Sequence, residues 1–230
     1  MTGPPRQLTL NWPHHPSFAA EAFLPASSNR AALAAIGRWP DWTSRMLLLT
    51  GPEGSGKSHL GAVWATRAAA MVVHAPALGA EEVKACAESP AILIEDADGV
   101  ADAEARLFHI VNDALQRASW LLLTARRAPD VWGLRTPDLL SRLRLAPVVT
   151  LGAPDIELTE AVLFKLFSDR QVQVEPRVIA FIALRIERSL SAAREIVAAL
   201  DREALSQGRR VTRAMAAELL REQPETDAPT

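Results

Sequence analysis

The hydrophobic residues of this chain fall into short runs and spaced repeats that predict alternating strands and helices. Short apolar runs bounded by Gly, Pro or polar residues predict buried strands at residues 45–50, 71–75, 91–95, 120–124 and 148–151. From residue 101 to 118, apolar residues recur at helical spacing. Further helices are expected at residues 28–39, 59–70 and 79–88. This alternation favours an α/β fold with a five-stranded parallel sheet.

After residue 153 the pattern changes and predicts helices only. Four amphipathic segments follow, at residues 157–169, 176–185, 191–205 and 212–220. They predict a small all-helical lid domain at residues 154–220, after an α/β domain at residues 18–153. Residues 1–17 contain four of the sixteen prolines and no helical periodicity, so we expect a flexible arm there. The polar residues 221–230 predict a disordered tail.

A phosphate-binding motif connects the first predicted strand to the helix after it. The segment Gly51-Pro52-Glu53-Gly54-Ser55-Gly56-Lys57-Ser58 matches G-x-x-x-x-G-K-[ST] at every position. In such a loop, backbone N–H groups surround a polyphosphate, the lysine adds charge at the β- and γ-phosphates, and the final hydroxyl ligates Mg²⁺. The helix that follows directs its positive N-terminus at the same phosphates. The residues that we expect to bind the nucleotide are Gly51, Pro52, Gly54, Ser55, Gly56, Lys57, Ser58 and His59.

Polar residues at the ends of two later strands are candidates for the chemistry of that nucleotide. The strand at residues 91–95 ends in Glu95-Asp96. One carboxylate can hold Mg²⁺ through water, as Glu95 would together with Ser58, and the other can polarise an attacking water. Thr124 ends the next strand and could orient a water or the γ-phosphate. The alternatives, an acidic strand end and a simple strand terminator, stay open.

Two arginines are candidates for contacts with phosphate. Arg142 precedes the last predicted strand, where it could supply charge to the nucleotide of a neighbouring subunit, or could be a solvated residue at a helix end. Arg194 lies in the first turn of the helix predicted at residues 191–205. Since the helix dipole disfavours a cation there, Arg194 indicates an anionic partner such as the β- and γ-phosphates.

The predicted arm contains the segment Gln7-Leu8-Thr9-Leu10-Asn11-Trp12. In an extended peptide, Leu8, Leu10 and Trp12 project on the same side and form an apolar face. Such a segment suits docking into a groove of another protein, or packing on the chain's own domain.

Composition excludes several classes of protein. The net charge of −2 argues against a strongly basic nucleic-acid surface, so we expect contact with DNA only through a partner. Cys86 is the only cysteine, which excludes an internal disulfide and a cysteine-based metal site. No stretch approaches the ~20 apolar residues of a membrane span, and the N-terminus does not resemble a signal peptide. We therefore expect a cytoplasmic protein.

Together these motifs resemble the AAA+ ATPases over residues 18–220. The phosphate loop, Glu95-Asp96, Thr124, Ser141-Arg142-Leu143 and Ser191-Ala192-Ala193-Arg194-Glu195 occur in the order of Walker A, Walker B, sensor 1, box VII and sensor 2. The local sequences at box VII and sensor 2 look like those of the replication initiator DnaA. Residues 7–12 look like the sliding-clamp motif of the Hda family of DnaA-related regulators, and the DNA-binding domain that follows the AAA+ module in DnaA is not expected here.

This resemblance implies a function in the control of replication initiation. It implies a protein that binds ADP or ATP with Mg²⁺, docks on the DNA polymerase sliding clamp (β subunit) through residues 7–12, and promotes hydrolysis of DnaA-bound ATP with Arg142 as a trans arginine finger. It also allows a homodimer or a higher oligomer. Glu95 stands where the family usually has Asp, and Thr124-Ala125-Arg126 lacks a nearby acidic residue of DnaA, so weak or no intrinsic ATPase is expected. The alternative is an independent AAA+ ATPase, such as a helicase loader or a DnaA-like remodelling factor.

Overall fold

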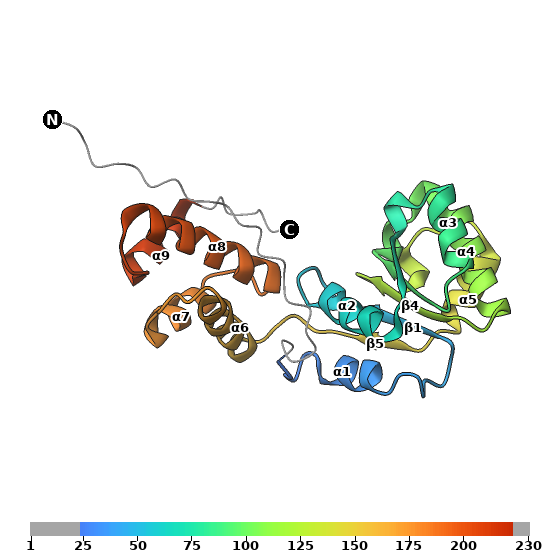
Figure 1. Ribbon diagram of the computed structural model, residues 1–230, viewed down its shortest axis with the longest axis horizontal. Coiled ribbons are helices and arrows are strands. Elements are labelled where there is room, and N and C mark those ends of the chain that lie inside the picture. The colour runs from blue at the N-terminus through green and yellow to red at the C-terminus, as the bar shows by residue number, and fades with distance from the viewer. Residues whose placement is uncertain (1–23, 223–230) are drawn as a thin grey trace. The chain divides into compact units, whose positions relative to one another are not determined.

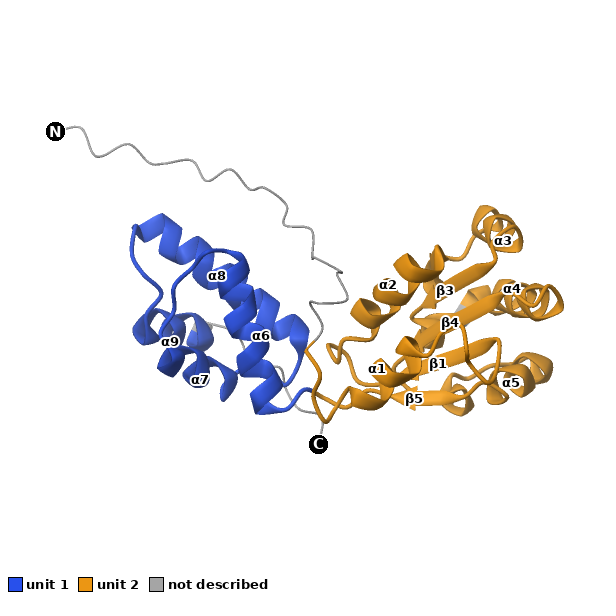
Figure 2. Cartoon of the chain, turned by 60° about the horizontal axis from the view of Figure 1, so that its bottom comes forward, with its two compact units in different colours: residues 1–17, 154–230 blue, residues 18–153 orange. Residues whose placement is uncertain are grey.

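The computed structural model describes residues 24–222 of the 230-residue chain. Contacts divide it into two compact units, one of residues 18–153 and one of residues 1–17 and 154–230 (Figure 2). The whole predicted arm, including residues 7–12, and most of the predicted tail lie outside the described part. The last helix continues to Glu222, however, so the first two residues of the predicted tail are helical.

The first unit contains a five-stranded sheet in the order β2-β3-β4-β1-β5, of which Figure 2 labels β3, β4, β1 and β5. Its strands are β1 (Met46–Thr50), β2 (Met71–His74), β3 (Ala91–Glu95), β4 (Trp120–Ala125) and β5 (Val148–Thr150). All neighbouring strands pair in parallel, which confirms the predicted sheet. The central strands β1 and β3 are buried along their whole length, because helices cover both faces of the sheet, and this explains their unbroken apolar runs.

Helices lie on both sides of the sheet (Figures 1 and 2), and alternate residues of the strands pack against different helical layers. On one face, Leu48, Ile94 and Leu123 contribute to a core with the second set of helices, and on the other, Leu49 and Leu93 contribute to a core with the first set. The first set is α1 (Arg30–Gly37) and α2 (Lys57–Ala68). The second set is α3 (Ala80–Ala87), α4 (Glu104–Gln116) and α5 (Pro137–Arg144). The helix α5, directly before the last strand, was not among the predicted elements.

The described part of this unit also contains the short 3₁₀ turns η2 (Ala75–Ala77), η3 (Ala97–Gly99), η4 (Ala101–Ala103) and η5 (Pro129–Val131). The first of them ends β2 at His74, one residue before the predicted end, since Pro76 cannot donate to a strand ladder. The turn η4 occupies the residues where α4 was expected to begin. The buried Cys86 of α3 has a raised pKa, about 11, because burial and then Glu82 disfavour its thiolate.

Four tryptophans join α2 to the sheet. Trp42 stacks on Trp64 of α2 with ring centroids 5.5 Å apart, and Trp39 and Trp120 pack edge-on against this pair. The Arg45 guanidinium lies 4.0 Å from the Trp120 ring centroid. Aromatic pairs of this kind contribute about 0.5–1.5 kcal/mol each beyond the area that they bury. The cluster therefore fixes the helix that follows the phosphate loop.

The second unit is helical. It contains α6 (Ile156–Asp169), α7 (Pro176–Ala183), α8 (Leu190–Gln207) and α9 (Arg213–Glu222). Leu163, Phe167 and Leu200 are among the buried residues of its separate core. The Ser189 side chain caps α8 by accepting from the Ala192 N–H at 3.0 Å, and Gly208 ends it in a left-handed conformation. Within residues 24–222, no helix is both long and apolar enough to cross a membrane.

Candidate nucleotide-binding site

The phosphate loop runs from β1 to α2 with backbone conformations that require glycine. At Gly51, a Cβ atom would lie 2.4 Å from the Leu151 carbonyl oxygen, so no side chain fits there. Gly56, directly before α2, has φ of 99°, in the left-handed region that L residues rarely adopt. These two positions explain why the motif has glycine at its first and sixth residues.

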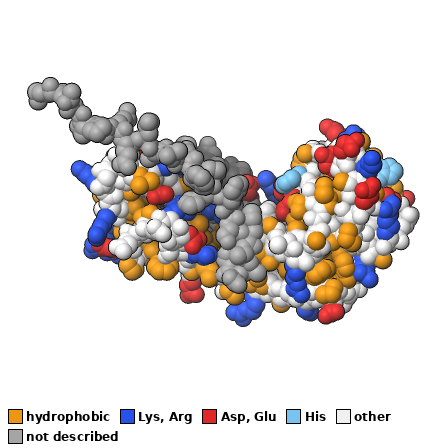
Figure 3. Space-filling model, viewed as in Figure 1, with side chains coloured by type: hydrophobic (Ala, Val, Ile, Leu, Met, Phe, Trp, Pro, Cys, Tyr) orange, Lys and Arg blue, Asp and Glu red, His pale blue; other side chains and the backbone are white. Residues whose placement is uncertain are grey.

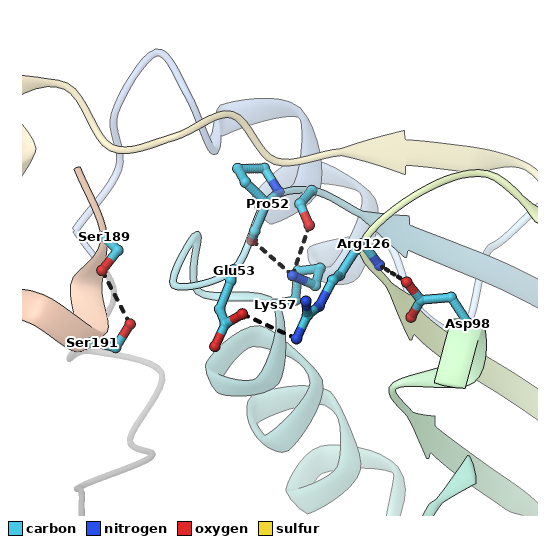
Figure 4. Close-up of polar contacts among 8 residues, drawn as sticks. Pro52, Glu53, Lys57, Asp98, Arg126, Ser189 and Ser191 are labelled. Atoms are coloured by element: carbon cyan, nitrogen blue, oxygen red, sulfur yellow. Dashed lines mark hydrogen bonds and ion pairs between the residues drawn. The ribbon is translucent and has the colours of Figure 1, made fainter. Parts of the chain in front are cut away.

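Lys57 is buried in this loop and donates to backbone carbonyls (Figure 4). Its Nζ lies 2.8 Å from the carbonyl oxygen of Gly51 and 2.8 Å from that of Pro52. Burial lowers the pKa of Lys57 below its usual 10.5 and the positive Arg126 acts in the same direction, whereas nearby carboxylates, first among them Asp96, oppose the shift. A third N–H remains on an ammonium that makes two bonds. A phosphate oxygen is the kind of acceptor that would relieve this buried charge.

The start of α2 and one buried hydroxyl also fit an anion. The first turn of α2 has no acidic residue, and no side chain among residues 24–222 caps it. Its leading N–H groups can therefore donate to a phosphate, with the helix dipole in favour. Ser55 is 4% exposed, and within residues 24–222 its Oγ has no hydrogen-bond partner. Together with Lys57, these groups fit the polyphosphate of a nucleotide.

The structure brings Ser58, Glu95, Asp96 and Thr124 together at the carboxyl ends of β3 and β4. Glu95 Oε2 accepts from Ser58 Oγ at 3.1 Å and from Thr124 Oγ1 at 2.6 Å. Thr124 Oγ1 also accepts from the Asp96 backbone N–H at 3.1 Å. Thr124 is fully buried and links both carboxylate residues, which a simple strand terminator would not do.

The same groups fit a magnesium ion. Ser58 Oγ and Glu95 Oε2 lie 3.1 Å apart, close enough for both side chains to face one ion. Among the described residues, no three His, Cys, Asp or Glu side chains form a group that could hold a metal by themselves. Phosphate oxygens and water would have to complete the coordination, which is the usual arrangement for Mg²⁺.

Gly61 is a site residue that sequence reasoning missed. A Cβ atom at this position of α2 would lie 3.0 Å from Glu95 Oε1 and 3.2 Å from Leu93 Cδ2. The glycine therefore makes room for a glutamate that is one methylene longer than aspartate. A glycine inside a helix is unfavourable by about 1 kcal/mol relative to alanine. Its presence in the helix predicted at residues 59–70 could therefore have indicated that another group packs closely against that position.

We expect Gly61→Ala to lower the thermal unfolding midpoint by several degrees. Overpacking costs about 1–3 kcal/mol, which exceeds the helix-propensity gain of about 1 kcal/mol. Adding Glu95→Asp should recover part of the lost midpoint, because the shorter side chain withdraws from Cβ while the contact with Leu93 stays. The matched control is Gly37→Ala, where no atom lies within 4 Å of the added Cβ. A midpoint raised by Gly61→Ala alone would show that the side chains of Glu95 and Leu93 do not crowd this position of α2.

Arg142 lies outside this cluster. It is on α5, which packs with α4 on the face of the sheet opposite α2. Its guanidinium carbon is 5.7 Å from the Phe108 ring centroid, and no ion pair or hydrogen bond joins that guanidinium to another residue of the described part. Arg144 of the same helix is instead paired with Asp130, with its Nε 2.8 Å from Oδ1.

Glu104 was also missed, and it positions α5. Its carboxylate accepts from the backbone N–H groups of Arg135 at 2.9 Å and Thr136 at 2.6 Å, directly before α5. Burial acts to raise the pKa of Glu104, but these hydrogen bonds outweigh it and hold the pKa below its usual 4.5. The contacts of Glu104 and Asp130 could not be predicted from the sequence, because the partners of each residue are distant in the chain.

The structure shows fewer contacts for the remaining residues that were predicted to bind nucleotide or clamp. His59 is the third residue of α2 and is half-buried. Arg194 is exposed and is the fifth residue of α8, which begins at Leu190, so it lies just beyond the first turn in which it was predicted; within the described residues its side chain has no hydrogen bond or ion pair. Its contact with phosphates stays a prediction, and residues 7–12 lie outside the described part.

Comparison with known proteins finds a relative in sequence and several in fold. No protein-family model matches the chain. It is 25% identical over 215 residues to the chromosomal replication initiator protein DnaA of Cutibacterium acnes (strain DSM 16379 / KPA171202), an alignment that covers 82% of this chain and 42% of that protein. The chain thus spans about two fifths of the length of this relative.

Solved structures show the same fold. Domain III of Thermotoga maritima DnaA matches with a TM-score of 0.76 at 20% identity, over 90% of this chain and 97% of that one. AMPPCP-bound DnaA from Aquifex aeolicus matches with a TM-score of 0.65 at 16% identity, over 80% and 64%. The RuvB Holliday junction branch migration motor of Thermotoga maritima matches with a TM-score of 0.63 at 19% identity, over 83% and 65%. The chain has the α/β AAA+ fold of DnaA domain III, and in sequence it is similar to DnaA.

Proposed function

We propose that this chain is a DnaA-related regulator of the Hda type. It binds adenine nucleotide with Mg²⁺, docks on the DNA polymerase sliding clamp, and promotes hydrolysis of the ATP bound to DnaA. Its effect is to limit replication initiation. Its own site serves chiefly to bind nucleotide and has weak or no intrinsic ATPase activity.

The phosphate loop supports the nucleotide part of this proposal. Lys57, Ser55 and the first N–H groups of α2 would hold the phosphates, and Ser58 with Glu95 would hold Mg²⁺, partly through water. The ion, when bound, neutralises charge on the phosphate oxygens. The similar DnaA from Aquifex aeolicus has AMPPCP bound.

The observation that carries the regulatory part is the position of Arg142. This cation packs on the face of the sheet opposite the helix of its own phosphate loop, while its neighbour Arg144 is held by Asp130. Glu104 fixes the start of the same short helix. A positioned arginine away from the chain's own phosphates is suited to the phosphates of another subunit, where it would stabilise charge on the transferring phosphoryl group.

The contact with DNA would be indirect, through the clamp. On the face of the α/β unit seen in Figure 3, basic side chains are scattered among acidic and hydrophobic ones, with no continuous basic surface. A direct phosphate-backbone contact would need such a surface.

An independent AAA+ ATPase is the second candidate. Asp96 favours it, since this carboxylate is exposed beside Glu95, where it could polarise an attacking water. This candidate predicts steady hydrolysis of ATP by the chain alone, without DnaA or clamp, whereas the regulator does not.

The clamp contact is tested through the arm. We expect Gln7→Ala with Leu8→Ala to abolish co-elution with the sliding clamp on size-exclusion chromatography, because the change removes the polar anchor and one member of the apolar face. The control, Pro4→Ala with Pro5→Ala, alters the same arm outside the motif and should co-elute like wild type. Circular dichroism checks that each variant is folded. Persistent co-elution of the Gln7/Leu8 variant would mean that residues 7–12 do not bind the clamp.

A further inference from the structure

Arg126 joins the end of β4 to the phosphate loop. It is the first residue after that strand, and its backbone N–H donates to Asp98 Oδ2 at 3.0 Å. Its side chain reaches the phosphate loop, where Nη2 lies 3.0 Å from Glu53 Oε2 (Figure 4). The backbone of Arg126 is therefore held in place while its guanidinium engages a carboxylate beside Lys57.

The ion pair between Arg126 and Glu53 is weak, so the guanidinium can leave Glu53 for another anion. The two side chains are 63% and 73% exposed, and exposed pairs of this kind contribute about 0–1 kcal/mol. A terminal phosphate carries more charge than a carboxylate and accepts two parallel N–H bonds from the planar guanidinium. A phosphate at the Lys57 end of the loop would compete directly with Glu53 for Arg126.

The charge around Lys57 favours that exchange. Burial is the main cause of the lowered pKa of Lys57, and the positive charge of Arg126 contributes in the same direction. Two cations therefore act on each other at this point, and an anion between them would relieve their repulsion. Asp96 and Asp98 already balance part of the charge, but Asp98 also bonds to the Arg126 backbone N–H.

We propose that Arg126 senses the terminal phosphate of the bound nucleotide, and that Glu53 holds the guanidinium until this phosphate replaces it. The inference rests on the nucleotide site of the proposed function and adds a residue that distinguishes triphosphate from diphosphate. Arg126 lies two residues after Thr124, whose hydroxyl bonds to Glu95 of the carboxylate cluster; a triphosphate that extends to this cluster would gain the contact, and a diphosphate would not.

The test compares the affinities of the full chain for ADP and for AMPPCP, a triphosphate analogue that is not cleaved between its β and γ groups. We expect Arg126→Ala to weaken AMPPCP binding by about tenfold or more, the effect of one charge-assisted contact, and ADP binding by less than about twofold. Glu53→Gln should strengthen AMPPCP binding because it removes the competing carboxylate. In the double variant this gain should vanish. Isothermal titration calorimetry gives each affinity.

The control is Arg127→Ala, which removes an equal charge from the next residue, also exposed. It should leave both affinities near wild type. If Arg126→Ala weakened the binding of ADP and AMPPCP equally, or weakened neither, the inference would be overturned while the nucleotide site would stand. Failure of the wild-type chain to bind either ligand would instead overturn the proposed function.

Discussion

The Lys57→Ala protein is expected to bind ADP at least about tenfold more weakly than wild type. Lys57 is 7% exposed, and the backbone carbonyls that it contacts form the wall of the phosphate loop. A buried charge-assisted contact of about 1.5–3 kcal/mol corresponds to about ten- to a hundredfold in affinity. Isothermal titration calorimetry with ADP and Mg²⁺ measures the change directly.

The control for this substitution is Lys84→Ala, which removes an equal charge from α3. It should leave ADP affinity unchanged. Thermal unfolding of Lys57→Ala without nucleotide should stay close to wild type, because the truncation also relieves the cost of a buried ammonium. ADP affinity equal to that of wild type in a folded Lys57→Ala protein would show that the phosphate-loop assignment is wrong.

The parts of the fold that sequence predicted are those encoded in contiguous residues. The phosphate loop is one eight-residue motif, and β3 and β4 are buried strands whose apolar runs need no partner to be recognised. Parallel strands that end in polar residues bring these residues to one edge of the sheet. For this reason the contact between Glu95 and Thr124 could be anticipated in kind, although its distance could not.

The interactions that sequence could not predict join residues distant in the chain. Glu104 acts on backbone N–H groups in the loop before α5, and Arg126 reaches Glu53 across two strand ends. Neither pair follows from local spacing, because many charged residues are equally separated. The clearance at Gly61 likewise depends on where the side chain of Glu95 turns. Such details require the packed helices and sheet.

The Arg142→Ala protein is expected to lose its stimulation of ATP hydrolysis on DnaA while it keeps its own nucleotide and clamp binding. Arg142 is joined to its chain only through α5 and the Phe108 ring within the described residues, so truncation should leave the fold intact. A contact made only in the transition state lowers the rate and leaves ground-state affinity unchanged. For arginine fingers of GTPases this effect is about 10³–10⁵ in rate. Arg142→Lys should rescue poorly, since an ammonium lacks the planar fork that engages two phosphate oxygens.

The decisive measurement is single-turnover hydrolysis of ATP preloaded on DnaA, with clamp loaded on DNA and either wild-type or variant protein added. Arg144→Ala is the matched control, because it removes an equal charge from the same helix end and breaks only an exposed ion pair with Asp130. It should retain most of the stimulation. Equal loss in both variants would indicate a general effect of charge on α5, and full stimulation by Arg142→Ala would remove this residue from the mechanism. Rapid hydrolysis by the wild-type chain without DnaA would favour the independent ATPase, since its own carboxylates at Glu95 and Asp96 would then be sufficient for the reaction.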